Sequence, residues 1–422
     1  MTIRPAASSP VETNIPSSRT RQRKRILLFA EAVTLAHLAR PLAISGVLED
    51  SEWEVTLACD PRYSGFLGNF SGQYKGISSI APEAFLEALR RGRPVYDVPT
   101  LDRYVMEDLR VIREVDPHVI VGDFRLSLSV SARLAGVPYV SLANAYWSPF
   151  YEPGEWPVPE LWLTRFLPIA AAERVFRMAR PAAFALHSRP LNRVRRRHGL
   201  PDLGPSLPRV YTDADFVAYM DVPLLFPVRT HPPTHRFVGP ALWEPPVSLP
   251  TWWGEIGEDR PVVYVTLGSS GQASTASAVA QALGSLDAWV LVATAGRAEL
   301  PASSPNTRVA EFLPGNQLAR RADLVVCNGG SLTCYQALSA GVPVIGIASN
   351  LDQFLNTQAI ERAGAGLSVR ADRLRPDAPL RVARQVLTDA RFRPGARRVA
   401  AWCAEHALPN AVRDLLGGVA QA

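Results

Sequence analysis

The stretch from Asp323 to Glu361 constrains the fold more than any other part of the chain. An apolar run at 324–326 ends in a Gly-Gly turn, a helix-compatible segment opens at Ser331, and a second apolar run at 343–347 leads into a polar loop. This order of strand, glycine turn, helix, strand and loop predicts a βαβ unit. A helix N-terminus behind a glycine turn presents unpaired N–H groups and the positive end of the helix dipole, so it favours binding of a phosphate group.

The rest of the chain alternates between strand-like and helix-like segments in the same way. Apolar runs at 26–29, 53–58, 119–122 and 139–142 alternate with helical patterns at 35–48, 102–115 and 127–134. A further apolar run at 261–267 ends in a second turn of Gly and Ser before an Ala-rich helical segment. Such alternation predicts parallel βαβ units in doubly wound sheets, where ligands bind beyond the carboxyl ends of the strands.

The composition is that of a globular protein with room for more than one domain. The chain has 422 residues, of which 47% are hydrophobic and 20% charged. Residues 1–25 hold six basic residues against one acid, so most of the net charge of +6 lies in a polar tail that we expect to be disordered. The nearly neutral remainder argues against nucleic acid as a partner.

The cysteines and the apolar runs bear on the compartment. Cys59, Cys327, Cys334 and Cys403 show no metal-ligand spacing, and scattered cysteines are typical of a reducing cytosol. No run approaches the roughly 18 apolar residues of a membrane helix. The apolar run behind the tail is interrupted by Glu31 too early for a signal peptide. The sequence therefore predicts a cytoplasmic protein.

The segment 323–361 resembles the donor-binding region of the GT-B-fold glycosyltransferases that use nucleotide sugars, the family of macrolide, glycopeptide and plant natural-product enzymes. Their pattern runs His-Gly-Gly, a Thr or Ser, a Glu, Gly-Val-Pro, and then Asp-Gln followed by Asn. The corresponding residues here are Asn328, Gly329, Gly330, Thr333, Gln336, Gly341-Val342-Pro343, Asp352, Gln353 and Asn356. The resemblance implies that the first triplet and Thr333 bind the diphosphate and that Gln336 binds the ribose. It also implies that Asp352 and Gln353 contact sugar hydroxyls.

Two of these positions depart from the family pattern. Asn328 stands where the family has a His that helps to hold the diphosphate, and Gln336 stands where it has a ribose-binding Glu. Asn can donate a hydrogen bond to a phosphate oxygen but carries no positive charge. Gln can accept from a ribose hydroxyl without the charge assistance of a carboxylate. We expect both replacements to reduce donor affinity.

Two further segments resemble parts of the family that contact the donor. Gly268, Ser269 and Ser270 match the Gly-Thr/Ser turn that faces the nucleotide sugar. Phe312 lies two residues before a Pro, where the family places an aromatic ring that stacks on the nucleobase, and Leu313 follows it. Stacking of a ring on a base contributes ~1–3 kcal/mol.

The resemblance implies a GT-B fold, in which two Rossmann-like, doubly wound domains face each other across a cleft. We expect an acceptor-binding domain at 26–241 after the tail at 1–25, and a nucleotide-sugar-binding domain at 261–400. The segment 242–260 between them is rich in Pro, Trp and Glu and predicts a linker. By the same resemblance, the helix at 401–422 crosses back to the first domain.

Transfer of a sugar to a hydroxyl needs a base, because an alcohol is a weak nucleophile at neutral pH. A His held by a carboxylate suits this task, and the family uses such a pair. His37 and Asp123 lie near the ends of predicted strands, and Asp123 stands in a segment that resembles the Asp-bearing strand of the family. His37 precedes Pro41 by four residues where the family has three. Either the loop is rebuilt, or His37 only packs on the first helix and Glu31 is the base.

The segment 161–200 is strongly basic. It holds nine arginines against a single acid, Glu173, together with Trp162, Phe166, Phe176 and Phe184. One interpretation is a basic amphipathic face that makes peripheral contact with an anionic membrane. The other is a solvated helix face above the acceptor cleft.

The sequence thus predicts an inverting glycosyltransferase. It would move a sugar from a UDP- or TDP-sugar to a hydroxyl of a hydrophobic small-molecule or lipid acceptor. We expect no metal ion or other cofactor, because a helix dipole and hydroxyl groups can neutralise the leaving diphosphate. Two alternatives are a non-catalytic GT-B relative that binds a donor or a partner enzyme, and a nucleotide-sugar epimerase of similar fold.

Overall fold

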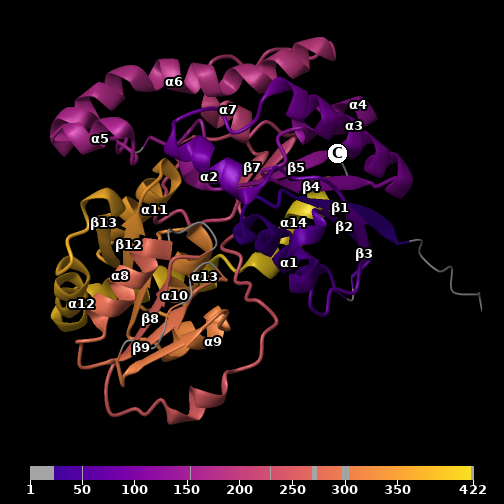
Figure 1. Ribbon diagram of the computed structural model, residues 1–422. Helices are drawn as coiled ribbons and strands as arrows, with labels where there is room; N and C mark the ends of the chain where they lie inside the picture. Colours follow the sequence, from indigo (N-terminus) through magenta and orange to yellow (C-terminus); the bar gives the residue numbers. More distant parts are fainter. Residues whose placement is uncertain are drawn as a thin grey trace, which may run out of the picture.

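The computed structural model of this chain describes residues 23–49, 51–152, 154–228, 230–268, 273–296, 300 and 304–419. Figure 1 shows two lobes, the first in indigo to magenta and the second mainly in orange. Two predicted donor-contacting residues, Ser269 and Ser270, lie outside the described residues, as does most of the tail that the sequence predicts to be disordered.

The first lobe is built on a parallel sheet. Its strands in the described residues are ordered β3-β2-β1-β4-β5-β6-β7, and every neighbouring pair is parallel. The strands are β1 (Lys24–Ala30), β2 (Trp53–Cys59), β3 (Gln73–Gly76), β4 (Val119–Asp123), β5 (Tyr139–Ala143), β6 (Phe216–Tyr219) and β7 (His235–Phe237).

Helices cover both faces of this sheet, because successive strand residues point to opposite faces and both faces are apolar. In β1, Ile26 and Leu28 pack in one core with α1 and α14, whereas Leu27 and Phe29 pack in another with α3 and α4. The helices are α1 (Leu35–Leu48), α2 (Pro82–Arg90), α3 (Val98–Val115), α4 (Leu128–Ala135), α5 (Trp162–Phe166), α6 (Ile169–Arg197) and α7 (Leu207–Tyr211), with short 3₁₀ turns η1 (Pro61–Phe66) and η2 (Ala145–Trp147).

The second lobe repeats the design. Its described strands form a parallel sheet in the order β10-β9-β8-β11-β12-β13. The strands are β8 (Val262–Thr266), β9 (Trp289–Ala293), β10 (Thr307–Ala310), β11 (Leu324–Cys327), β12 (Val344–Ala348) and β13 (Gly366–Arg370). The helices are α8 (Ala273–Leu283), α9 (Gly315–Arg321), α10 (Ser331–Ser339), α11 (Leu351–Arg362), α12 (Ala378–Thr388) and α13 (Phe392–Glu405), with the 3₁₀ turn η4 (Ala371–Arg373).

Two connections join the lobes. The linker between β7 and β8 contains the 3₁₀ turn η3 (Thr251–Glu255). At the other end of the chain, α13 packs in the core of the second lobe, and α14 (Leu408–Val419) packs on α1 and β1 in the first lobe. Figure 1 shows α14, in yellow, beside α1. The predicted domain boundary at residue 400 therefore falls inside α13, and the chain changes lobes only after Glu405.

The order of the strands indicates at which point of each sheet a ligand would bind. In an open parallel sheet, ligands bind where neighbouring strands connect to opposite sides of the sheet. In the first lobe this point lies between β1 and β4, beyond Ala30 and Asp123, which are paired in register. In the second lobe it lies between β8 and β11, beyond Thr266 and Cys327. The predicted GT-B arrangement thus brings these two edges together.

Among the described residues, none of the helices has the length and apolar character of a membrane span.

Gly239, just after β7, packs against the turn between α13 and α14, so a substitution at this position tests how the two connections between the lobes pack. Its φ is +80°, and a Cβ placed there would lie 1.7 Å from the carbonyl oxygen of His406, between α13 and α14. Gly204 has a φ of +76° with nothing within 4 Å of such a Cβ. Both Gly→Ala variants should lose about 1–2 kcal/mol from the left-handed backbone, and Gly239→Ala should lose clearly more because backbone cannot move aside easily. Thermal unfolding of the two variants measures the difference. Equal losses of stability would contradict the packing of Gly239 against His406.

Candidate functional site

Two cavities meet between the lobes. The small cavity, of about 120 Å³, lies at the β8/β11 edge of the second lobe, and the large cavity, of about 340 Å³, lies mainly in the first lobe. Thr34, Ala36 and Gly330 line both cavities. A molecule bound in one cavity would therefore contact a molecule bound in the other.

The small cavity is built around the glycine turn before α10. The side-chain oxygen of Asn328 accepts a hydrogen bond from the Gly330 N–H at 3.1 Å, and Asn356 Nδ2 donates to the Gly329 carbonyl at 2.8 Å. Gly329 has a φ of +81°, and a Cβ there would lie 2.4 Å from the methyl carbon of Thr357. Only glycine fits this turn, which directs the N-terminus of α10 at the cavity and so favours an anion there.

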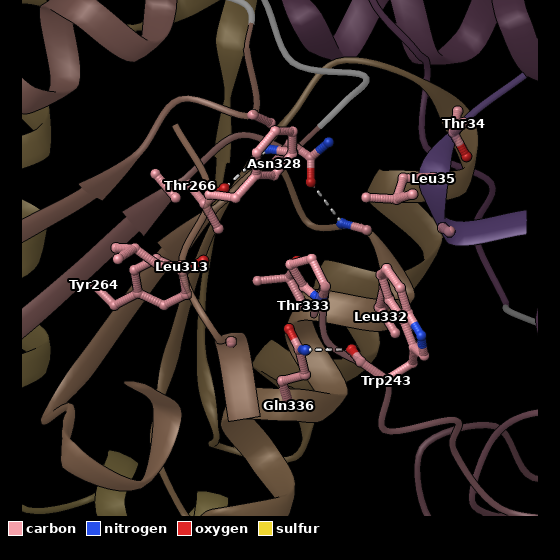
Figure 2. A pocket seen from close by; sticks show the side chains of 18 of the residues that line it. Thr34, Leu35, Trp243, Tyr264, Thr266, Leu313, Asn328, Leu332, Thr333 and Gln336 are labelled. Atoms are coloured by element: carbon pink, nitrogen blue, oxygen red, sulfur yellow. Dashed lines mark hydrogen bonds between the residues drawn. The ribbon is translucent and has the colours of Figure 1, made fainter. Parts of the chain in front are cut away.

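Figure 2 shows how the predicted donor residues lie in the small cavity. Asn328, Thr333 and Gln336 line it from the second lobe, while Thr34 and Leu35 line it from the first. Gly268 and Leu313 line it as well. The described residues among the predicted diphosphate and ribose contacts are therefore brought together.

The linker supplies part of the wall, which the sequence did not predict. Trp243 and Pro245 line the small cavity, and the Trp243 carbonyl accepts a hydrogen bond from Gln336 Nε2 at 2.7 Å. Gln336 thus fixes the linker with its amide nitrogen, a donor that the Glu of the family pattern does not have. The one sequence feature that could have indicated this role is a Trp at the start of the predicted linker.

Phe312 is another residue of the small cavity. It lines the cavity and meets Phe66 of the first lobe edge to face, with ring centroids 5.1 Å apart. The nearby Ala295 also lines the cavity and has a φ of +52°, an unfavourable backbone conformation for a residue with a side chain. The nucleobase-stacking role of Phe312 stays a prediction, and its ring already has an aromatic partner on the opposite lobe.

The large cavity has mostly apolar walls. They come from α2, from the edge of the first sheet and from α5, α6 and α7. The apolar residues lining it include Phe85, Leu89, Phe124, Leu142, Trp147, Leu161, Leu163, Val175, Phe176, Phe184 and Leu207. Such a surface favours an apolar ligand with few polar groups.

His37 and Asp123 meet at the polar end of the large cavity. His37 lies in the first turn of α1, and its Nδ1 is 2.7 Å from Asp123 Oδ1. The Asp123 side chain is 1% exposed and that of His37 is 19% exposed. Because a carboxylate can only accept, Nδ1 carries the proton and Nε2 is left as an acceptor. The one-residue departure before Pro41 has therefore not separated the pair.

The position of the imidazole is further restricted by Phe124. This residue follows β4 with a φ of +55°, and its ring stacks on that of His37 with centroids 4.9 Å apart. A left-handed backbone at an aromatic residue is costly and occurs mainly where the surroundings impose it, often at functional sites. The same turn thus directs the Asp123 carboxylate and the Phe124 ring at His37.

A buried polar chain extends from Asp123 to the second lobe. Arg40 Nη1 lies 3.5 Å from Asp123 Oδ2, and its Nη2 donates to the side-chain oxygen of Asn144. Asn144 Nδ2 in turn contacts both carboxylate oxygens of Asp221, each at 3.2 Å, and Ser331 Oγ at 3.1 Å. Burial raises the pKa of Asp221 to about 6. Ser331 is the first residue of α10, so this chain links Asp123 to the N-terminus of that helix.

The alternative base, Glu31, is excluded by its surroundings. Its side chain is fully buried and accepts hydrogen bonds from Arg125 Nη1 at 2.9 Å and the Tyr104 hydroxyl at 3.1 Å. Burial raises its pKa despite the Arg125 charge. Glu31 lines neither cavity, so it has no access to a bound acceptor. It instead balances the buried Arg125 together with Asp108.

Asp352 and Gln353 both lie on the large cavity, but their side chains differ in availability. Gln353 Oε1 accepts from the Ser349 N–H at 2.9 Å and, in the capping box of α11, from the Asn350 N–H, so it mainly shapes the loop. Asp352 Oδ1 accepts from Trp147 Nε1 of the first lobe at 2.9 Å. Asp352 thus joins the lobes and faces the cavity at the same time. Their contact with sugar hydroxyls stays a prediction.

All four cysteines are buried as free thiols, and no group of three or more His, Cys, Asp or Glu side chains in the described ranges is arranged to hold a metal ion. The expectation that the chain needs no metal or other cofactor stays a prediction.

Comparisons with known proteins show what this arrangement belongs to. The family described as "Erythromycin biosynthesis protein CIII-like, C-terminal domain" matches residues 277–417. A "PGL/p-HBAD biosynthesis rhamnosyltransferase" from Mycobacterium bovis (strain BCG / Pasteur 1173P2) is 48% identical over 379 residues, which cover 90% of this chain and 84% of the relative. This chain belongs to the same glycosyltransferase family.

Two further similarities concern activity and fold. An "Inactive PGL/p-HBAD biosynthesis glycosyltransferase" from the same strain is 44% identical over 280 residues, 66% of this chain and 76% of that relative. The solved structure of a "Spinosyn Rhamnosyltransferase SpnG complexed with thymidine diphosphate" superposes with a TM-score of 0.65 at 20% identity, over 93% of this chain and 100% of that one. The predicted GT-B fold and the predicted glycosyltransferase family are confirmed, which leaves the epimerase alternative without support.

The bond between Trp147 and Asp352 gives a test of how the glycosyltransferase presents Asp352. Trp147→Phe keeps an aromatic ring but removes the indole N–H, so the carboxylate loses the donor that orients it. A hydrogen bond to a charged group is worth about 1.5–3 kcal/mol, which predicts a roughly 10- to 100-fold lower kcat/KM for sugar transfer. Affinity for free nucleotide diphosphate, measured by calorimetry, should not change, because Asp352 does not line the small cavity.

Trp156→Phe is the matched control. Its ring lies 6.3 Å from that of Trp147, and its indole N–H has no protein acceptor in the described part of the chain. If both variants lost activity equally, the aromatic wall rather than the hydrogen bond to Asp352 would be responsible.

Proposed function

We propose that this glycosyltransferase moves a sugar, with inversion at the anomeric carbon, from a UDP- or TDP-sugar to a hydroxyl of a hydrophobic acceptor. The observation that carries the proposal is the junction of the two cavities. His37 and Asp123 lie on the large cavity where Gly330, before the N-terminus of α10, lines both. A base and an anion-binding helix end thus flank one point, as displacement of a diphosphate by a hydroxyl requires.

The small cavity supports a nucleotide diphosphate as the leaving group. The α10 N-terminus, Asn328 and Thr333 present donors to one side of it, and these would hold the diphosphate oxygens. The spinosyn enzyme of similar fold was solved with thymidine diphosphate. The name of the curated relative specifies rhamnose. TDP-rhamnose is therefore the first donor to test, with UDP-sugars beside it.

The large cavity supports a hydrophobic acceptor with a single buried hydroxyl. Its walls are mostly aromatic and aliphatic, and His37, Arg40 and Asp123 lie together among its polar groups. An apolar ligand would bury its body against α6 and leave its hydroxyl beside the imidazole. Burial of apolar surface contributes about 25 cal/mol per Å², so such a ligand needs few hydrogen bonds to be held.

The proposed reaction is a single displacement. The acceptor oxygen attacks the anomeric carbon from the side opposite the diphosphate, and the hydroxyl proton passes to His37 Nε2. The bond from the anomeric carbon to the diphosphate oxygen breaks, and its electron pair leaves with the nucleotide diphosphate. Asp123 accepts the hydrogen bond from Nδ1 and stabilises the imidazolium that forms. The Arg40 guanidinium partly compensates the negative charge of the Asp123 carboxylate.

A non-catalytic role is the alternative that one relative raises, since its name calls it inactive. The alignment with that relative covers only 66% of this chain, whereas the alignment with the rhamnosyltransferase covers 90%. The intact pairing of His37 with Asp123 and the joined cavities favour catalysis. Incubation of the chain with TDP-rhamnose, UDP-sugars and a panel of phenols and long-chain alcohols tests this directly. Release of nucleotide diphosphate in equal amount to glycosylated product is expected, and binding of donors without any product would overturn the proposal.

The role of His37 has its own test. His37→Ala should lower kcat by roughly 10²–10⁴, because the acceptor hydroxyl loses its general base. Asp123→Asn should keep a hydrogen-bonding group of the same shape but favour the wrong tautomer, so it should also reduce kcat. Steady-state kinetics of sugar transfer measure both effects.

His187→Ala is the control, because His187 lines the same cavity but contacts the Gly92 carbonyl instead of a carboxylate. It should retain a kcat close to that of the parent. Near-full activity of His37→Ala would remove His37 from the mechanism.

A further inference from the structure

Helices α5 and α6 carry an unusual amount of exposed apolar surface. The three most exposed large hydrophobic side chains of the described residues lie on them: Met178 at 84%, Phe166 at 79% and Trp162 at 72%. Figure 1 shows the two helices along the outer side of the first lobe, with α5 reaching toward the second. Large apolar side chains exposed on two consecutive helices indicate a surface that another body covers.

Contacts of one side of α5 with the second lobe determine which of its side chains are exposed. Leu163 and Thr164 are buried, and Thr164 Oγ1 donates to Asp372 Oδ2 at 2.6 Å. Arg373 Nη2 donates to the Leu167 carbonyl at 3.1 Å just after the helix. Since this side is tied to the second lobe, Trp162 and Phe166, four residues apart, must point away from the protein on the opposite side.

On α6 one face is apolar at its start and basic at its end. Val175, Met178 and Leu186 are exposed and lie at spacings that place them on one face. The same face continues with Arg189, Arg193 and Arg196, at steps of three, four and three residues. This helix therefore presents an apolar stripe followed by a cationic one.

The charge of this segment is only partly opposed by acids. The segment 161–200 contains nine arginines and one acid. Five of the arginines pair with acids that lie outside the segment, whereas no acidic partner is present for Arg189 or Arg193 in the described residues. Exposed aromatic and aliphatic side chains beside unpaired arginines are complementary to a surface with anionic headgroups above an apolar layer.

The exposed stripe borders the mouth of the large cavity. Val175 belongs to both, since it lines the cavity and is 46% exposed. Phe176 and Phe184 on the adjacent face of α6 also line the cavity. Val175 thus joins the exposed apolar stripe of α6 to the lining of the cavity that contains His37.

We propose that α5 and the exposed face of α6 lie on an anionic lipid bilayer and that a lipid-borne acceptor enters the large cavity from it. This inference rests on the proposed hydrophobic acceptor. The aromatic and aliphatic side chains insert at the headgroup level, and the arginines bind the anionic lipids. The enzyme then takes the acceptor hydroxyl to His37 without passing the lipid chain through water.

Vesicle flotation of the full chain tests the surface apart from catalysis. Vesicles of equal parts phosphatidylcholine and phosphatidylglycerol should bind the chain, and phosphatidylcholine alone or high salt should weaken binding about tenfold or more. A Trp162→Ser/Phe166→Ser/Met178→Ser variant and an Arg189→Glu/Arg193→Glu variant should each lose binding to a similar extent. Met106→Ser is the control, because Met106 is 59% exposed on α3, outside this surface, and should bind as the parent does.

Activity assays separate this inference from the proposed function. The triple Ser variant should transfer sugar to a short, water-soluble acceptor at the parental rate, because none of its three positions lines a cavity, but slowly to an acceptor embedded in vesicles. No product with any acceptor would overturn the proposed function while leaving the vesicle result to stand. Parental vesicle binding by both variants would overturn the membrane surface. A dimer that the triple variant disperses, with no vesicle binding, would instead assign the surface to a second copy of the chain.

Discussion

The hydrogen bond between His37 and Asp123 is the interaction on which the site depends. A carboxylate with almost no contact with water is stable as an anion only if positive or donating groups replace the lost hydration. Here the imidazole N–H lies at 2.7 Å and the Arg40 guanidinium at 3.5 Å. Strand pairing sets Asp123 level with Ala30, the last residue of β1, so the turn into α1 needs only a few residues to bring His37 to it.

Three contacts across the cleft align the second lobe with this pair. Asn144 meets Ser331 at the start of α10, Trp147 meets Asp352, and the rings of Phe66 and Phe312 meet edge to face. The first two join residues on the cavities themselves. Relative motion of the lobes would therefore break the contacts that hold the base, the anion-binding helix end and Asp352 in one arrangement.

Local patterns predicted much of this arrangement. The apolar runs indicated the strands, the glycine turn indicated the anion-binding end of α10, and the motif at 328–356 indicated the family. Contacts between distant segments were beyond such patterns. Trp243 lines the small cavity because the linker folds back on Gln336. Arg40 contacts Asn144 because the parallel sheet places the residues after β1 and β5 at the same edge. Glu31 looked available because its partner, Arg125, is almost a hundred residues away. The α13–α14 boundary depended on which lobe each helix packs against, and periodicity does not show that.

The anomeric configuration of the product tests the central claim most directly. A single displacement, in which the acceptor hydroxyl attacks from the His37 side, must invert the configuration at the anomeric carbon. The coupling constants of the anomeric carbon and proton in a proton and carbon NMR spectrum of the purified product, compared with those of the donor, determine it. Inversion is predicted. Retention would contradict the proposed attack of the acceptor hydroxyl from beside His37 and would require a second displacement that the described residues do not support.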